Sequence, residues 1–114
     1  MSEVTFTIDS KTFSANIFDN ATAQYLLDKL PLSITMHDLN NNEKYHKFNE
    51  RFPTNTQKVE HINKGDIMLY QDSYLVIFYK SFDATYRYTP IGTITNPDSL
   101  EDINHKSDID ITIK

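Results

Sequence analysis

Four histidines, set among many acidic residues, are the side chains of this chain that could bind a metal ion. They are His37, His46, His61 and His105. A metal site needs ligands that converge from fixed spacings, as in HxH or HExxH motifs, and neither motif occurs. His37 and Asp38 are adjacent, but adjacent residues of a strand point to opposite faces. We therefore expect four surface histidines and no metal site.

The other side chains that could perform covalent or acid–base chemistry also lack the required surroundings. The chain has no cysteine, and no serine lies in a GxSxG nucleophile elbow. Gly65 and Gly92 are the only glycines, so a glycine-rich phosphate loop is absent from the sequence. Glu101 and Asp102 stand at the start of an expected helix, where the helix dipole favours negative charge. These patterns predict no catalytic residue and no cofactor site.

Aromatic side chains are the group that favours a binding site. Five of them cluster in the second half of the chain: Tyr74, Tyr79, Phe82, Tyr86 and Tyr88. In a β-domain, aromatic residues commonly form the core and cross-strand pairs, and this interpretation stays open. The alternative is a groove, because aromatic walls with few polar groups are typical of small-ligand sites.

The composition indicates a folded domain and argues against several partners. A chain of 114 residues can bury a core of its own, and we expect one domain over residues 1–114. With 16 acidic and 11 basic residues, it lacks the basic stripe of a nucleic-acid-binding protein. No apolar run is long enough to span a membrane, and the start MSEVTFTID is not typical of a signal peptide. We expect a cytoplasmic protein that binds neither nucleic acid nor membrane.

Alternating apolar and polar residues near the N-terminus predict a hairpin followed by one helix. Residues 4–8 and 12–18 alternate and are joined by the turn Asp9-Ser10-Lys11. Asp19-Asn20 offers a helix cap, and Pro31 ends the helix. Between them, apolar residues recur at helical spacing: Ala23, Leu26, Leu27 and Leu30. We expect this helix to cover the mouth of a barrel.

The middle of the chain predicts further strands, two of which form an apolar hairpin. Residues 32–39 alternate, and the turn at residues 40–42 leads into a weaker strand over 43–48. Residues 65–94 read GDIMLYQDSYLVIFYKSFDATYRYTPIGTI. This segment predicts two apolar strands joined by a polar turn, then an aromatic loop and a short strand that carries Gly92.

Three other stretches complete the expected architecture. Residues 49–64 show no clear period and form the longest irregular stretch. Pro97-Asp98-Ser99 begins a short helix over residues 100–103. Residues 108–114 alternate regularly, and we expect this last strand to pair beside the first.

The order of these elements, with its motifs, resembles the cyclophilin fold over nearly the whole chain. VTFTIDSKTFSANIFDNATAQYLLDKL is similar to a cyclophilin opening, and IGTITNPDSLEDI to a cyclophilin close. GDIMLY, LVIFYKSF and YTPIGTI resemble more closely the small bacterial cyclophilin-like proteins, a family of unknown function. The resemblance implies a mainly β protein: a single closed barrel of about eight strands with two short helices.

The resemblance also bears on proline isomerisation. True cyclophilins use an arginine on the third strand to weaken the amide resonance of the prolyl bond, which sets a barrier of about 18–20 kcal/mol. The corresponding residues 32–39 contain no arginine. Tyr74-Leu75-Val76 stands in place of the Gln-Phe-Phe motif, and Tyr88 in place of a late histidine. A divergent peptidyl-prolyl isomerase is therefore the alternative rather than the first expectation.

The first expectation is a non-catalytic binding module that takes a peptide or small molecule in an aromatic groove beside the barrel. The resemblance places Tyr74, Tyr86 and Tyr88 on the binding face, and alternation adds Val76 beside Tyr74. Met36 is expected as a flexible floor. The predicted groove residues are Met36, Tyr74, Val76, Phe82, Tyr86 and Tyr88. A further alternative is interaction with a flavodoxin-like redox protein, since some relatives are fused to such domains.

Overall fold

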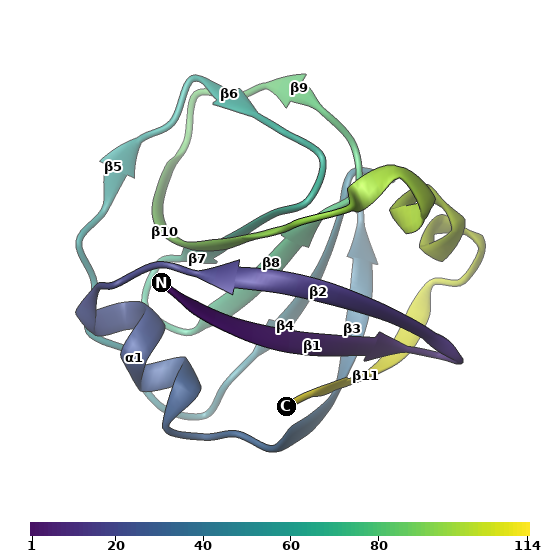
Figure 1. Ribbon diagram of the computed structural model, residues 1–114. Coiled ribbons are helices and arrows are strands. Elements are labelled where there is room, and N and C mark those ends of the chain that lie inside the picture. Colours follow the sequence, from purple (N-terminus) through teal and green to yellow (C-terminus); the bar gives the residue numbers. More distant parts are fainter.

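Eight antiparallel strands close into a barrel, as the sequence predicted (Figure 1). Around the barrel their order is β2-β1-β11-β3-β4-β8-β7-β10, and β10 pairs back onto β2. The barrel strands are β1 (Ser2–Ile8), β2 (Lys11–Ile17), β3 (Leu32–Leu39), β4 (Glu43–Lys47), β7 (Asp66–Tyr70), β8 (Tyr74–Phe78), β10 (Arg87–Ile94) and β11 (Asp108–Ile113). The last strand pairs with the first, and the expected position of residues 108–114 is confirmed.

The computed structural model describes the backbone of residues 1–114 and every side chain except four. The four are those of Glu101, Asp102, Asn104 and His105. The expectations for the acidic pair Glu101-Asp102 and for His105 therefore lie outside the described side chains.

Three very short strands lie outside the barrel wall. β5 (Gln57–Lys58) pairs with β10, while β6 (His61–Ile62) and β9 (Phe82–Asp83) form a two-stranded ribbon. Figure 1 shows this ribbon at the top, beside the barrel. Residues 49–64 are therefore less irregular than predicted, because strands of two residues are too short to show an alternating pattern.

The two predicted helices differ in kind and length from the expectation. α1 (Ala21–Leu27) begins at Asn20, whose side-chain oxygen accepts a hydrogen bond from the Ala23 amide at 2.8 Å. It ends at Leu27 instead of continuing to Leu30, and Asp28 and Lys29 form a turn after it. The second helix, η1 (Pro97–His105), is a 3₁₀-helix. The two lie at opposite sides of the barrel in Figure 1.

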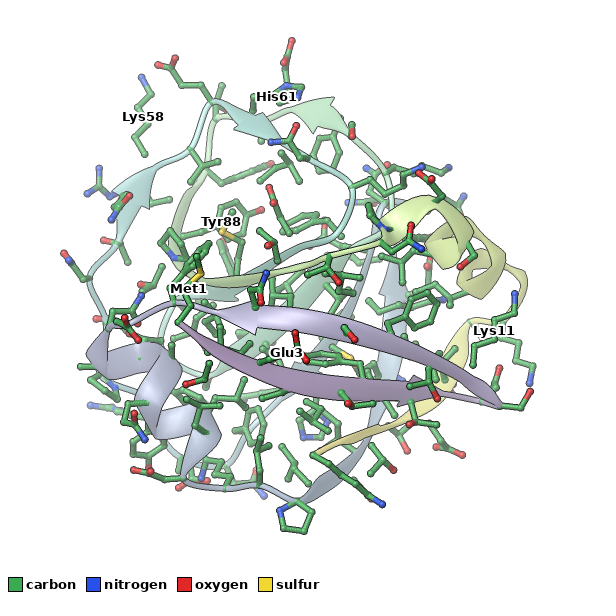
Figure 2. The ribbon with its side chains drawn as sticks, in the orientation of Figure 1. Met1, Glu3, Lys11, Lys58, His61 and Tyr88 are labelled. Carbon is green, nitrogen blue, oxygen red and sulfur yellow. The ribbon has the colours of Figure 1, made fainter. Side chains whose placement is uncertain are left out.

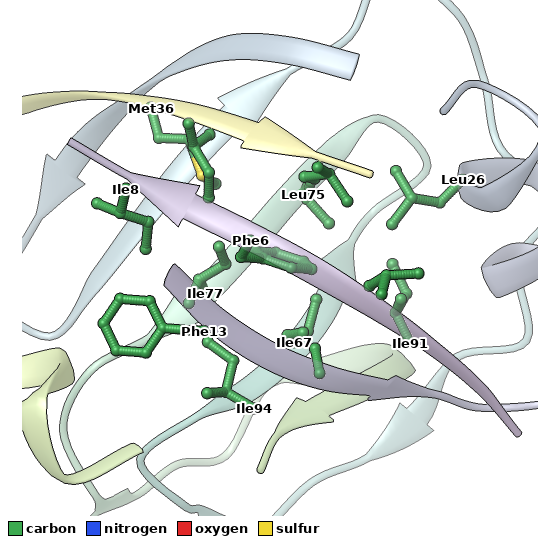
Figure 3. Close-up of a cluster of buried hydrophobic side chains, with 14 of the residues drawn as sticks. Phe6, Ile8, Phe13, Leu26, Met36, Ile67, Leu75, Ile77, Ile91 and Ile94 are labelled. Atoms are coloured by element: carbon green, nitrogen blue, oxygen red, sulfur yellow. The ribbon is translucent and has the colours of Figure 1, made fainter. Parts of the chain in front are cut away.

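The barrel interior is filled by the apolar side chains that alternation turns inward (Figure 3). Phe6 from β1, Met36 from β3 and Ile77 from β8 are fully buried there. α1 adds Leu26, which is 1% exposed, so the helix packs one side of its short length onto this core. The same alternation leaves the other face of each strand to the outside of the barrel, where the candidate site lies.

Gly92 permits the close approach of strands where the barrel closes. It pairs with Ile17 of β2 on one side and with Ile67 of β7 on the other. A Cβ added at Gly92 would lie 2.3 Å from the Asn16 carbonyl oxygen. Real Cβ atoms do not approach backbone oxygens so closely, so any side chain at residue 92 pushes β10 away from β2.

We expect Gly92→Ala to lower the free energy of unfolding by about 1–3 kcal/mol, the usual cost of overpacking. The matched control is Thr93→Ala on the same strand, which adds no atom at the contact with β2. Urea denaturation followed by circular dichroism measures both variants. Equal midpoints for the two would contradict the assigned role of Gly92 in closure.

Candidate functional site

A second apolar cluster lies on the outer wall of the barrel. The strands β7, β8 and β10 send alternate side chains outward, where the ribbon of β6 and β9 packs against them. The buried members are Ile62, Met68, Val76, Phe78, Ala84 and Tyr88. This outer cluster supports a wall of aromatic residues at its margin.

Two adjoining cavities, with volumes of about 270 and 200 Å³, lie at that margin. Both are lined by Leu39, Glu43 and Tyr70, so they lie next to each other on the outer wall. We name the two cavities together the tyrosine groove. Its lining residues are Leu39, Asn40, Glu43, Tyr45, Tyr70, Gln71, Tyr74, Val76, Tyr86 and Tyr88.

Strand register brings the tyrosine rings of the groove together. Tyr70 is the cross-strand partner of both Tyr74 and Tyr88. The ring centroids of Tyr70 and Tyr88 are 5.7 Å apart, and those of Tyr70 and Tyr74 are 6.1 Å apart. Tyr45 continues the row at 6.1 Å from Tyr74, whereas Tyr86 precedes β10 and is 59% exposed. The result is a wall of aromatic faces with hydroxyl groups among them.

The structure brings together four of the six predicted groove residues. Tyr74, Val76, Tyr86 and Tyr88 all line the tyrosine groove. Their common position follows from the register of β7, β8 and β10; in the sequence it was implied by the resemblance to cyclophilins, and alternation added only Val76 beside Tyr74. Val76 and Tyr88 belong at the same time to the buried outer cluster, so these two side chains contribute to packing as well as to the cavity lining, and their part in binding stays a prediction.

Two predicted groove residues lie elsewhere. Met36 is fully buried inside the barrel, because its face of β3 turns inward; it is not the groove floor. Phe82 belongs to β9 and packs against the Phe78 ring at 5.7 Å, away from the groove lining. Tyr79, from the same aromatic cluster of the sequence, is also fully buried in the barrel core.

Sequence reasoning missed six of the groove-lining residues: Leu39, Asn40, Glu43, Tyr45, Tyr70 and Gln71. Tyr70 faces Tyr74 across the turn at Gln71, whose φ is 54°, so the apolar hairpin itself carried the signal for Tyr70. Glu43 and Tyr45 come from the strand that the pattern identified only weakly. Their placement depends on the pairing of β4 with β8, which local patterns do not specify.

Glu43 is the charged side chain of the groove lining. It is 8% exposed. Burial, reinforced by the negative charge of Asp38, raises the pKa of the Glu43 carboxyl to about 7. Burial, and to a smaller extent the negative charge of the nearby Glu43, likewise raises the pKa of the Tyr88 hydroxyl to about 12. The groove therefore holds a carboxyl group whose pKa is raised to about 7, beside the Tyr88 hydroxyl, whose pKa is raised as well.

An ion pair between a fully buried lysine, Lys44, and a half-buried aspartate, Asp38, lies within the barrel wall at the residue next to Glu43. The Lys44 side chain is fully buried, and its Nζ lies 3.0 Å from Asp38 Oδ1 and also donates to the Lys106 carbonyl. The Tyr79 hydroxyl donates to the same Asp38 oxygen at 2.5 Å. Burial acts to raise the pKa of Asp38, but the hydrogen bonds from Tyr79 and Lys44 outweigh it and lower the pKa overall. Lys44 therefore pairs with Asp38 and not with a group in the tyrosine groove.

Both arginines lie away from the tyrosine groove. Arg51 Nε is 3.5 Å from Asp72, and Arg87 donates to the Thr56 carbonyl at 3.0 Å. Neither is among the residues that line the two cavities. The groove thus lacks the arginine that true cyclophilins direct at the prolyl bond.

Three histidines have local partners. His37 lies 2.8 Å from Asp108, and His61 lies 2.9 Å from Asp83. His46 lies 2.9 Å from the Thr35 carbonyl oxygen. Figure 2 shows His61 at the rim of the molecule, in contrast to the more central Tyr88. Within the described side chains, no three acidic or imidazole groups gather as metal ligands would.

Comparison with known proteins agrees with this architecture. A model of the cyclophilin-like family matches residues 6–114, whereas no curated protein matches the chain. A solved structure described as McbB in complex with tryptophan superposes with a TM-score of 0.67 at 16% identity. The superposition covers 97% of this chain but only 44% of McbB, so the two proteins share a fold over less than half of McbB. In the described part of the chain, no helix has the length and apolar character needed to cross a membrane.

Proposed function

This chain belongs to the cyclophilin-like family, and we propose that it is a non-catalytic binding module that holds a small molecule or peptide in the tyrosine groove. The observation that carries the proposal is the convergence of five tyrosines on two adjoining cavities. Their rings offer apolar contact area, and their hydroxyls offer hydrogen bonds that fix a ligand's orientation.

The size and lining of the groove support a small ligand. Small-molecule sites measure about 300–1,000 Å³ and combine aromatic walls with a few polar groups. The larger cavity of the groove, about 270 Å³, is slightly below that range by itself, and the adjoining cavity adds about 200 Å³. McbB, of the same fold, was solved with tryptophan. Tryptophan is therefore a reasonable first compound to test, although the likeness extends to the fold alone.

The proposal predicts that a ligand is retained by the native protein and depends on Tyr86. Mass spectrometry of the natively purified protein identifies the retained compound, and calorimetry measures its affinity for variants. We expect Tyr86→Ala to weaken binding about two- to tenfold, the worth of one aromatic contact. Because Tyr86 is 59% exposed, its removal should leave the fold unchanged.

The matched control for Tyr86 is Thr85→Ala, at the neighbouring exposed residue outside the groove lining. Tyr88 is tested as Tyr88→Phe, because it is 4% exposed and its ring supports the outer cluster. If Tyr86→Ala and Thr85→Ala bind the retained compound as tightly as the unchanged protein, the groove is not its binding site.

Other expectations from the sequence stay predictions. The absence of arginine from the groove lining favours binding over proline isomerisation. An interaction with a flavodoxin-like protein and a cytoplasmic location are tested by other experiments, such as co-purification and cell fractionation.

A further inference from the structure

Glu43 is held in the tyrosine groove by the barrel wall itself. It is the first residue of β4, where it pairs with Leu39 of β3 on one side and with Phe78 of β8 on the other. Its side chain lines both cavities of the groove. Alternation along β4 gives Lys44 the opposite, inward direction. The carboxyl group of Glu43 is therefore presented to the groove from a rigid strand.

The Glu43 carboxyl has no partner among the described residues. No hydrogen bond or ion pair joins it to another described side chain, although it is 8% exposed. In the same described set, no side-chain polar atom is both sealed from solvent and unpartnered. The two Glu43 oxygens must therefore reach the small open space that remains beside them, which is the groove.

The two lysines nearest to Glu43 in the sequence do not pair with its carboxyl group. Lys44 is fully buried and pairs with Asp38. Lys47, at the far end of β4, lies at the groove wall with its Nζ 6.0 Å from the centre of the Tyr74 ring, but no ion pair joins it to Glu43. A buried carboxylate without a positive partner is unfavourable, and unusual acids of this kind are concentrated at functional sites. A counter-charge is the missing component of this groove.

The other titratable groups that face Glu43 cannot supply that charge. Asp38 on β3 is itself negative and raises the pKa of Glu43. Tyr70 on β7, Tyr74 on β8 and Tyr88 on β10 line the same cavities and carry no basic group. Their ring faces carry partial negative charge, which attracts cations. Carboxylate and rings therefore favour the same kind of ligand group.

We propose that the ligand of the tyrosine groove carries a cationic nitrogen, such as a protonated amine, that pairs with Glu43 while the tyrosine rings surround it. This inference rests on the proposed binding function and specifies the chemical class of the ligand. Neutral or anionic ligands of the same shape would leave Glu43 without its counter-charge.

The pairing makes binding depend on pH in a defined direction. Glu43 must be ionised to attract a cation, and its pKa in the free protein is about 7. Affinity should therefore increase about tenfold from pH 6 to pH 8, because the ionised fraction rises by that factor. His37 on β3 is the other group to control, since its ring centroid lies 5.7 Å from that of Tyr45 and imidazoles change charge in this range.

A pair of indole compounds tests the proposal directly. The chain has no tryptophan, so indole fluorescence reports the probe alone. Tryptamine carries a protonated amine, and tryptophol has a neutral hydroxyl in its place. We expect tryptamine to bind at least tenfold more tightly than tryptophol at pH 8, because hydrogen bonds to charged groups are worth more than neutral ones.

Variants identify the group responsible. We expect Glu43→Gln to weaken tryptamine binding about tenfold and to abolish its pH dependence, with tryptophol unaffected. Glu3→Gln, at an exposed acid on β1, should change neither probe, and His37→Gln should leave the pH dependence in place. Thermal unfolding at pH 8 checks that Glu43→Gln folds; it should be no less stable, since it removes an unpaired buried charge.

The outcomes separate this inference from the proposed function. Equal binding of tryptamine and tryptophol, both weakened by Tyr86→Ala, would overturn the role of Glu43 and retain the groove. An undiminished tryptamine affinity in Glu43→Gln would overturn the inference in the same way. Binding of neither probe at millimolar concentration would also overturn it, while the native ligand would still decide the proposed function.

Discussion

Replacing Asp38 with alanine should lower the free energy of unfolding by about 3–5 kcal/mol, the usual cost of breaking a buried ion pair from one side. The variant leaves the fully buried Lys44 ammonium without its carboxylate, which lies 3.0 Å away. It also removes the acceptor of the Tyr79 hydroxyl. Urea denaturation at neutral pH measures the loss, with exposed Asp98→Ala as the control for removing an acid.

The opposite substitution, Lys44→Met, should cost far less than Asp38→Ala. Methionine is similar in length and needs no counter-charge, and replacing the charged member of a buried pair by an apolar group avoids its desolvation. The remaining Asp38 side chain is 18% exposed and keeps the Tyr79 hydrogen bond. Equal losses for the two variants would contradict the asymmetry on which this prediction depends.

At acidic pH, the unchanged protein and Asp38→Ala should differ less in their free energy of unfolding than they do at neutral pH. The pKa of Asp38 is lowered in the folded protein, so its ionisation stabilises the fold above the ordinary pKa of an aspartate. That contribution is lost as the pH falls through the lowered pKa. Denaturation midpoints measured between neutral pH and strong acid therefore converge at the acidic end.

The individual strands and turns could be predicted because their signals are local, whereas the closed barrel was implied by the resemblance to cyclophilins. The alternation of residues 4–8 and 108–114 determines which face of each strand is buried, and a shift by one residue would expose it. The left-handed backbone at Asp9, with φ of 54°, and at Asn40 and Asn41, with φ of 56°, occurs at the two turns that short polar residues predicted.

The candidate site was only partly predictable because its residues meet through strand pairing. Glu43 and Lys44 are adjacent and similarly polar, yet one faces the groove and the other the barrel interior. Nothing in their local pattern distinguishes them. Met36 was misplaced for the same reason: a methionine suits both an irregular pocket and a core, and the direction of β3 decides between them.

Removing most of the Ile77 side chain should produce another large loss of stability. Ile77 is fully buried and lies opposite Ile67 of β7 and Lys44 of β4, at the centre of the barrel wall (Figure 3). Ile77→Ala removes apolar contacts and leaves a cavity that closed strands cannot collapse to fill. We expect a loss of about 2–5 kcal/mol in the free energy of unfolding.

Ile34→Ala provides the matched control for Ile77→Ala, because it deletes the same atoms from another barrel strand. Ile34 on β3 is only partly buried and packs at the margin of the same cluster. Ile34→Ala therefore removes less buried apolar surface than Ile77→Ala and leaves a space that water can enter. Its loss in free energy of unfolding should be clearly smaller. Urea denaturation measures both variants, and their midpoints can be compared directly where the dependence of the free energy of unfolding on urea concentration is the same. Similar losses for both variants would mean that the inner cluster is not centred on β7 and β8.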